Sequence, residues 1–253
     1  MLRLVTIPIS HYCEKARRAL EYAGLSYREE PHVQGLHQLY ARRAGGGRTV
    51  PVLLTPGGPI GESEQILEFC DRSVPGERSL FGSDDKQRAD VLALSRRFDA
   101  VLGPSARRLI YVHMLAQPKV ALKFNNQGVP AWEDRAIRHG FPLMRRFVGR
   151  VLGIRPGIEV ADEAAVWREL DFVAGLLADG RAHLLGDRFT AADLTFGALA
   201  AAVVLPTTYG WRLPQPEELD AATAALVARA REHPAGAYAL RLGAHRREQS
   251  GGR

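Results

Sequence analysis

The sequence contains little cysteine: only Cys13 and Cys70 occur in 253 residues, too few for a disulfide framework. Sparse cysteine is typical of proteins from a reducing compartment, so we expect a cytoplasmic protein. A chain of this length can bury a sizeable core without covalent cross-links. Its stability is therefore expected to come from packing.

Long hydrophobic runs are also missing. Residues 1–8 are too short an apolar run for a signal peptide, and Pro8 and His11 prevent the run from extending further. The most apolar helix candidate, residues 194–206, is well short of the roughly 20 residues that span a bilayer. We therefore interpret this segment as a core helix and expect no membrane partner.

Lysine is scarce and arginine abundant, which gives a formal charge of +6 and a pI of about 9.6. The arginines are spread along the chain, and no basic block interleaved with aromatic residues occurs. This pattern favours a mildly basic enzyme surface and no nucleic-acid partner. A weak positive potential would still attract a small anionic ligand.

Several catalytic motifs are absent as well. The chain has no C-x-x-C or H-E-x-x-H pattern and its histidines are scattered, so we predict no metal site. The glycines at 45–47 lack the lysine and spacing of a phosphate loop. The G-x-S-x-G elbow of serine hydrolases is missing too.

The first eighty residues do carry a clear pattern, because strand and helix signals alternate there. Apolar or β-rich runs at 2–9, 25–28 and 49–54 predict strands, and a turn cluster at 55–58 predicts a hairpin that returns through 59–61. Pro51 stands early in a strand that otherwise reads as central, and a cis bond between Val50 and Pro51 is one way to accommodate it.

From about residue 84 onward the signals are helical. The clearest helix is predicted at 163–177, from an apolar stripe with helical spacing. Another begins after Thr190, where Asp193 at the third helical position can accept from the Thr190 amide in a capping box. Residues 73–78 are expected to link an α/β region to an all-helical one.

The segment SHYCEKARRAL, residues 10–20, follows the first strand and begins a helix. Glutaredoxins and thioredoxins place a C-x-x-C pair at such a junction, but here Ser10 takes the first position and Cys13 the second. A site led by serine cannot close an internal disulfide. It can still ionise a thiol that a ligand brings, because a helix N-terminus and a hydroxyl both stabilise a thiolate.

Four motifs together resemble the cytosolic glutathione transferase family, and Ser10 resembles the active-site residue of its bacterial, serine-type members. They are SHYCEKARRAL, TVPVL, GESEQILEF and LLGDRFTAADLTFGALAA, in order between residues 2 and 201. The resemblance implies a thioredoxin-like α/β domain over 1–80, followed by an all-helical domain over 85–245. We expect residues 246–253 to be a disordered tail.

The resemblance also implies a catalytic role and a glutathione site. Ser10 would activate the thiol, Ser63 would hold the γ-glutamyl carboxylate, and Glu62 would face the amino group. The remaining residues expected to contact the peptide are Val50 and Pro51 beside its cysteinyl backbone, and Arg48, with His37 or Gln38 as alternatives, at its glycyl carboxylate.

The expected reaction adds glutathione, as co-substrate, to a small hydrophobic electrophile, a detoxification chemistry, in a homodimer. The second substrate would lie between the domains near Tyr12, Tyr111 and Met114, with Phe98 in the same apolar wall. Two alternatives stay open. Cys13 would be the nucleophile of a glutathione-dependent oxidoreductase or isomerase, or the chain would bind without turnover. Another low-molecular-weight thiol could replace glutathione.

Overall fold

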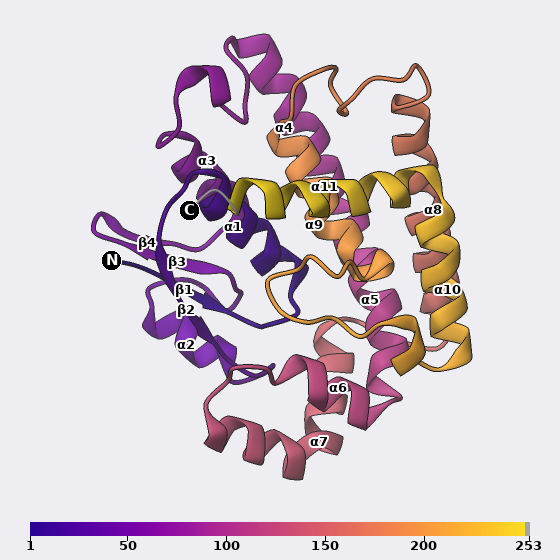
Figure 1. The fold of residues 1–253 in the computed structure, drawn as a ribbon. Coiled ribbons are helices and arrows are strands. Elements are labelled where there is room, and N and C mark those ends of the chain that lie inside the picture. Colours follow the sequence, from indigo (N-terminus) through magenta and orange to yellow (C-terminus); the bar gives the residue numbers. More distant parts are fainter. Residues whose placement is uncertain (251–253) are drawn as a thin grey trace.

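A four-stranded sheet and a larger group of helices lie side by side in the computed structural model of the chain (Figure 1). The structure describes the backbone of residues 1–250 and the side chains of residues 1–243. Residues 251–253, the end of the predicted tail, lie outside the described residues.

The sheet has the strand order β2-β1-β3-β4. Strand β1 (Leu2–Thr6) pairs in parallel with β2 (Tyr27–Pro31) and antiparallel with β3 (Val52–Thr55), which forms a hairpin with β4 (Gly58–Ile60). The parallel pair needs a crossover, and α1 (His11–Tyr22) supplies it. The β-α-β unit and the following hairpin are thus confirmed.

Small side chains let α1 pack closely on one face of this sheet. Ala16, Ala19 and Leu20 are fully buried there, in one cluster with Ile66 and Leu67 of α3 (Ser63–Asp71). A separate small cluster brings Ala41 of α2 (His37–Arg43) against β1 and β3. The sequence left residues 32–47 unassigned, and α2 lies within them.

The helical region follows a short 3-10 turn, η1 (Gly76–Arg78). It was predicted from about residue 84, and its first helix begins at Asp85. Its elements are α4 (Asp85–Ala100), α5 (Leu102–Leu115), α6 (Pro118–Asn125), α7 (Ala131–Val151), α8 (Ile158–Leu176), α9 (Ala191–Val204), η2 (Pro216–Glu218), α10 (Ala221–Glu232) and α11 (Pro234–Ser250).

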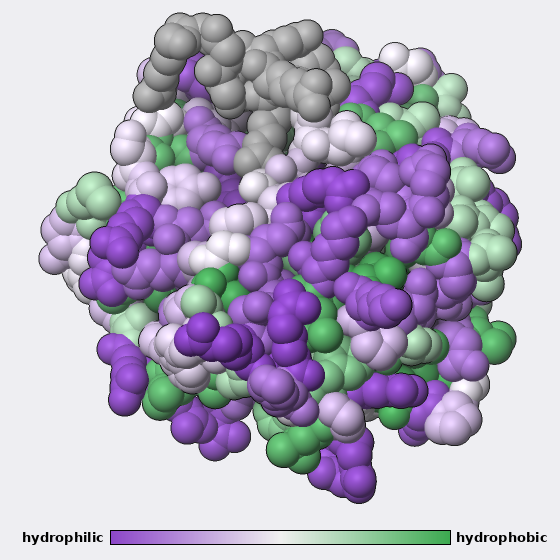
Figure 2. Space-filling model, turned by 60° about the horizontal axis from the view of Figure 1, so that its bottom comes forward, coloured by the Kyte–Doolittle hydropathy of each residue, from purple (hydrophilic) through white to green (hydrophobic). Residues whose placement is uncertain are grey.

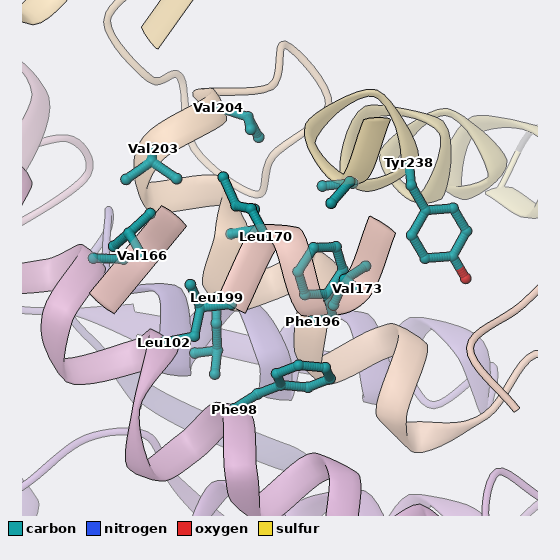
Figure 3. Packing of buried hydrophobic residues seen from close by; sticks show 14 of the residues in the cluster. Phe98, Leu102, Val166, Leu170, Val173, Phe196, Leu199, Val203, Val204 and Tyr238 are labelled. Atoms are coloured by element: carbon teal, nitrogen blue, oxygen red, sulfur yellow. The ribbon is translucent and has the colours of Figure 1, made fainter. Parts of the chain in front are cut away.

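Helix α9 runs through the core of the helical region and is buried along almost its whole length. Phe196 and Leu199 of α9 pack among Phe98 of α4, Leu102 of α5 and Tyr238 of α11 (Figure 3). The first turn of α9 also joins the cluster beneath the sheet, through Ala191 and Leu194. A single helix therefore ties the two regions together.

The predicted capping box at the start of α9 is confirmed. The Thr190 amide donates to Oδ2 of Asp193 at 2.8 Å. Asp193 is fully buried, and its other oxygen accepts from the Leu184 amide at 2.8 Å and from the Tyr238 hydroxyl at 2.5 Å. The box therefore also anchors α11 and the loop before α9.

The architecture is a thioredoxin-like α/β region followed by a helical region, as the sequence predicted. The helix expected at 163–177 begins earlier, at Ile158. Within residues 1–250 no helix is long and apolar enough to cross a membrane. Among the described side chains, residues 1–243, no three His, Cys, Asp or Glu residues group as metal ligands would.

Candidate active site

The turn between β1 and α1 presents Ser10. This residue is the N-cap of α1, with extended backbone (φ −70°, ψ 121°), and its Oγ accepts from the Cys13 amide at 3.4 Å. The side chain is only half-buried. Ser10 therefore serves as a helix cap, and its O–H can still donate to a ligand.

Cys13 lies one turn further along α1 and is fully buried. Burial raises the pKa of its thiol to about 11, and the nearby positive charge of Arg17 and the Ser10 hydrogen bond offset this only in part. A thiol with this pKa is protonated at neutral pH and is a poor nucleophile.

The turn itself is held by the buried guanidinium of Arg17. It donates to the carbonyls of Ile7 and Pro8 at 3.3 and 2.9 Å, and to Glu29 Oε1 at 2.7 Å. Glu14, also fully buried, accepts from the same guanidinium at 3.3 Å. The sequence reasoning missed this network, whose only signal is a dense run of charges in a helix that must pack on a sheet.

A segment from the far end of the chain closes over this network. The Tyr209 hydroxyl donates to the carbonyl of Ile9 at 3.1 Å, and the Gly210 amide donates to Glu14 Oε2 at 3.0 Å. A Cβ at Gly210 would lie 2.5 Å from Cδ of Arg17, so this approach requires glycine. The helical region thereby helps to shape the turn that carries Ser10.

The residues predicted to bind the glutathione backbone lie at two loop ends. The Val50–Pro51 bond is cis, and Val50 stands just before β3, which begins at Val52. Ser63 opens α3 and is nearly buried, while Glu62 is the extended N-cap residue, exposed and without a side-chain capping bond. The hydroxyl and carboxylate at this helix start thus have no recorded hydrogen bond within the described side chains.

The residues expected near the glycyl carboxylate differ in their exposure to solvent and in their charge. Arg48 is exposed and makes no ion pair with any described residue. His37 is buried, accepts from the Gly35 amide at 3.0 Å, and burial lowers its pKa to about 4. A neutral, engaged ring does not offer a positive charge to an anion. Gln38 is half-buried on the same helix.

The four residues predicted to line a second-substrate wall do not act as a group. Tyr12 and Tyr111 bridge the two regions: Tyr12 donates to the Asp99 carbonyl at 3.1 Å, and Tyr111 donates to Gln34 at 2.9 Å. Tyr111 is also buried, in the same cluster as Met114, while Phe98 lies in the main helical core.

Arg107 of α5 is a feature that the sequence reasoning did not single out. Its guanidinium lies 5.8 Å from the ring centre of Tyr12, and it makes no ion pair among the described residues. Burial, with the charge of Arg107, lowers the pKa of His11 to about 3. The buried His11 Nε2 and Arg107 Nε both lack a hydrogen-bond partner. The Arg107 guanidinium, which has no counter-ion among the described residues, thus lies near His11, the residue that follows Ser10.

Comparisons with known proteins bear directly on this geometry. Residues 4–78 match the family model described as glutathione S-transferase, N-terminal domain. Glutathione transferase F2 from Populus trichocarpa superposes with a TM-score of 0.58 at 14% identity, over 97% of this chain and 100% of that chain. The chain has the glutathione transferase fold. A search of curated proteins returned no match.

Two bacterial structures show the same glutathione transferase fold. A glutathione S-transferase domain-containing protein from Marinobacter aquaeolei VT8 matches with a TM-score of 0.59 and 18% identity, over 92% of this chain and 99% of that one. A glutathione S-transferase from Methylobacillus flagellatus kt, solved with gsh bound, matches with a TM-score of 0.54 and 15% identity, over 94% and 98%. The predicted fold is therefore confirmed.

Proposed function

We propose that this protein is a glutathione transferase that ionises the glutathione thiol at Ser10 and adds it to a small electrophile. The observation that carries the proposal is the position of Ser10: half-buried, at the N-cap of α1, on a turn held by Arg17. Its oxygen already accepts from the Cys13 amide, so its proton is left to donate to sulfur.

The physical need for such a site is clear. A free thiol with a pKa of about 8.5 is only about 3% ionised at pH 7. A hydrogen bond to a charged group contributes about 1.5 kcal/mol or more, which corresponds to about one pKa unit. The positive end of α1 acts in the same direction.

The rest of glutathione would lie along the loop ends on this side of the sheet. The first amides of α3 and the Ser63 hydroxyl suit the γ-glutamyl carboxylate, because a helix N-terminus attracts anions. The unpaired carboxylate of Glu62 suits the amino group, and the backbone of Val50, beside Pro51, suits the cysteinyl part. Arg48 suits the glycyl carboxylate. The bound gsh in the M. flagellatus protein supports a glutathione site in this fold.

The second substrate of this proposal lies between the two regions, near Tyr12, Tyr111 and Arg107. Because Arg107 has no carboxylate partner within the described residues, an electrophile that carries a negative charge is favoured over a neutral one of equal reactivity. The proposal includes a cytoplasmic homodimer. A thiol-exchange reaction at Cys13 is disfavoured because that thiol is buried and its pKa is raised to about 11.

The test is the rate of glutathione conjugation by Ser10→Ala and Ser10→Thr variants. Ser10→Ala removes both the hydroxyl and the cap, whereas Ser10→Thr keeps both, so we expect about tenfold slower turnover for the first and near-normal turnover for the second. Thermal unfolding of both variants measures the stability that the cap contributes, so that the rates can be compared at a temperature where both proteins are folded. Equal rates in the wild type and Ser10→Ala would refute the role of Ser10.

A further inference from the structure

Helix α7 exposes large apolar side chains along most of its length. Leu143 is 75% exposed, Val151 58%, Trp132 50% and Phe147 39%. The helix lies at the edge of the molecule, with α6 (Figure 1), and Figure 2 brings this end forward, where hydrophobic side chains alternate with strongly hydrophilic ones. Several large apolar side chains exposed on one element and rimmed by polar ones mark a candidate interaction site.

These exposed residues follow one line on the helix. Leu143, Phe147 and Val151 are spaced by four, so they lie above one another on the same side. The adjoining face, with Phe141, Met144 and Val148, is buried against α5 and α6. The core therefore accounts for one face of α7 and leaves the line at 143, 147 and 151 uncovered.

The same helix concentrates positive charge. No acidic residue occurs from 135 to 158, and the arginines in this stretch are Arg135, Arg138, Arg145, Arg146, Arg150 and Arg155. Arg138 pairs with Asp134 at 2.8 Å, but Arg145, Arg146 and Arg150 are exposed and make no ion pair in the described part of the chain. Arg146 and Arg150 directly flank the apolar line.

We propose that α7 binds the surface of an anionic lipid bilayer. The side chains at 143, 147 and 151 would enter the acyl boundary, while the flanking arginines contact the headgroups, as in interfacial amphipathic helices. This inference goes beyond the proposed function and does not depend on the glutathione site. The sequence alone predicted no membrane partner, because no apolar run is long enough to span a bilayer.

Charge and apolarity together favour this occupant over others. A nucleic acid would use the arginines but would leave leucine, phenylalanine and valine without an apolar partner. A second copy docked through the same face would bring unpaired arginines against arginines, which is costly. An anionic bilayer satisfies both parts of the surface at once.

The helix is also anchored well enough to act as a docking element. At its start, the buried carboxylate of Glu133 contacts His32 Nδ1 at 2.8 Å and accepts from the Val33 amide at 3.0 Å. Both bonds tie the start of α7 to the segment between β2 and α2, so docking would fix the orientation of the α/β region.

The test is flotation of the full chain with vesicles of phosphatidylcholine alone or mixed with phosphatidylserine. The test variant is Arg146→Glu with Arg150→Glu, and the control is Arg72→Glu with Arg168→Glu, which makes the same charge change at exposed sites at the C-cap of α3 and on α8. A second variant, Leu143→Ser with Val151→Ser, removes the apolar part and keeps every charge.

We expect binding to the mixed vesicles that weakens with salt, and little binding to the neutral ones. The α7 charge variant should lower the partition coefficient at least about thirtyfold, since each arginine at an anionic surface contributes roughly fivefold. The serine variant should bind more weakly at every salt concentration, and the control should bind like the wild type. No flotation with mixed vesicles, or equal loss in variant and control, would overturn the proposal. Self-association abolished by the α7 variants, without flotation, would instead assign the face to a second copy.

Discussion

Replacing Arg17 by methionine tests how the active-site turn is held. The guanidinium is buried and serves Glu14, Glu29 and the carbonyls of Ile7 and Pro8. Burial alone would lower the pKa of Arg17, but the two carboxylates outweigh it and raise the pKa, so the side chain stays charged.

The cost of Arg17→Met follows from what is left behind. Removing one partner of a buried charge pair costs about 3–5 kcal/mol, because the remaining carboxylate stays buried without compensation. The uncoupled carbonyls of Ile7 and Pro8 add to this, while water that enters beside half-buried Glu29 reduces it. We therefore expect a loss of about 4 kcal/mol in the free energy of unfolding.

Urea unfolding followed by circular dichroism measures this loss, with Arg28→Met as the control. Arg28 is exposed on β2, so its replacement should change stability by less than about 0.5 kcal/mol. Conjugation by any folded Arg17→Met protein should fall as well, because the turn under Ser10 loses its two carbonyl anchors. A loss below about 1 kcal/mol, with normal activity, would refute this account of the turn.

Four other changes have defined outcomes. Cys13→Ser should keep conjugation activity, and native Cys13 should resist iodoacetamide at pH 8 because its pKa is raised to about 11; rapid alkylation would contradict its burial. Asp193→Asn should lower the free energy of unfolding by about 2–4 kcal/mol in urea, since the buried capping box loses its charged acceptor; a change near zero would contradict the box as an anchor. Arg107→Gln should lower kcat/KM about tenfold for a carboxylate-bearing electrophile and leave a neutral one unchanged, in steady-state assays with both; equal effects would remove Arg107 from substrate selection. His11 and His37 have folded-state pKa values of about 3 and about 4, below the usual 6.5, so the unfolded chain binds more protons between pH 6.5 and 4. Stability should fall as pH drops through that window, and less steeply in His37→Gln, as unfolding at each pH would show; parallel curves would contradict the prediction.

Local chemistry is what made part of the structure predictable. The N-cap at Ser10 and the capping box at Thr190 depend on residues within one helical turn, so their signals are complete in short stretches of sequence. The cis bond at Val50–Pro51 is similar, because a proline at the start of a strand restricts the possibilities. The succession of strand, helix, strand and hairpin along the chain followed from the same local patterns, whereas the order of the strands within the sheet did not.

Long-range partners made the rest unpredictable. Glu14 and Arg17 look like solvent-facing charges until Gly210, nearly two hundred residues later, covers them. His37 was a plausible anion ligand until its burial and its bond to Gly35 were known. A local sequence pattern does not indicate which charged residue forms an ion pair and which, like Arg107, forms none with the described residues.

Helix α7 illustrates a third limit. A proline usually ends a helix, yet Pro142 lies inside α7, which continues to Val151. A proline within a helix removes one hydrogen bond, and here the packing of Phe141, Met144 and Val148 offsets that loss. Once the helix is continuous, arginines that seemed scattered in the sequence share one element.

The most direct test of the central claim is the ultraviolet thiolate absorbance of bound glutathione, titrated against pH in the wild type and in Ser10→Ala. The account predicts a thiol pKa at least about one unit below the free value of 8.5 in the wild type, and an increase of about one unit on loss of the hydroxyl. A bound thiol that titrates like free glutathione, or a pKa that is the same in both proteins, would contradict it.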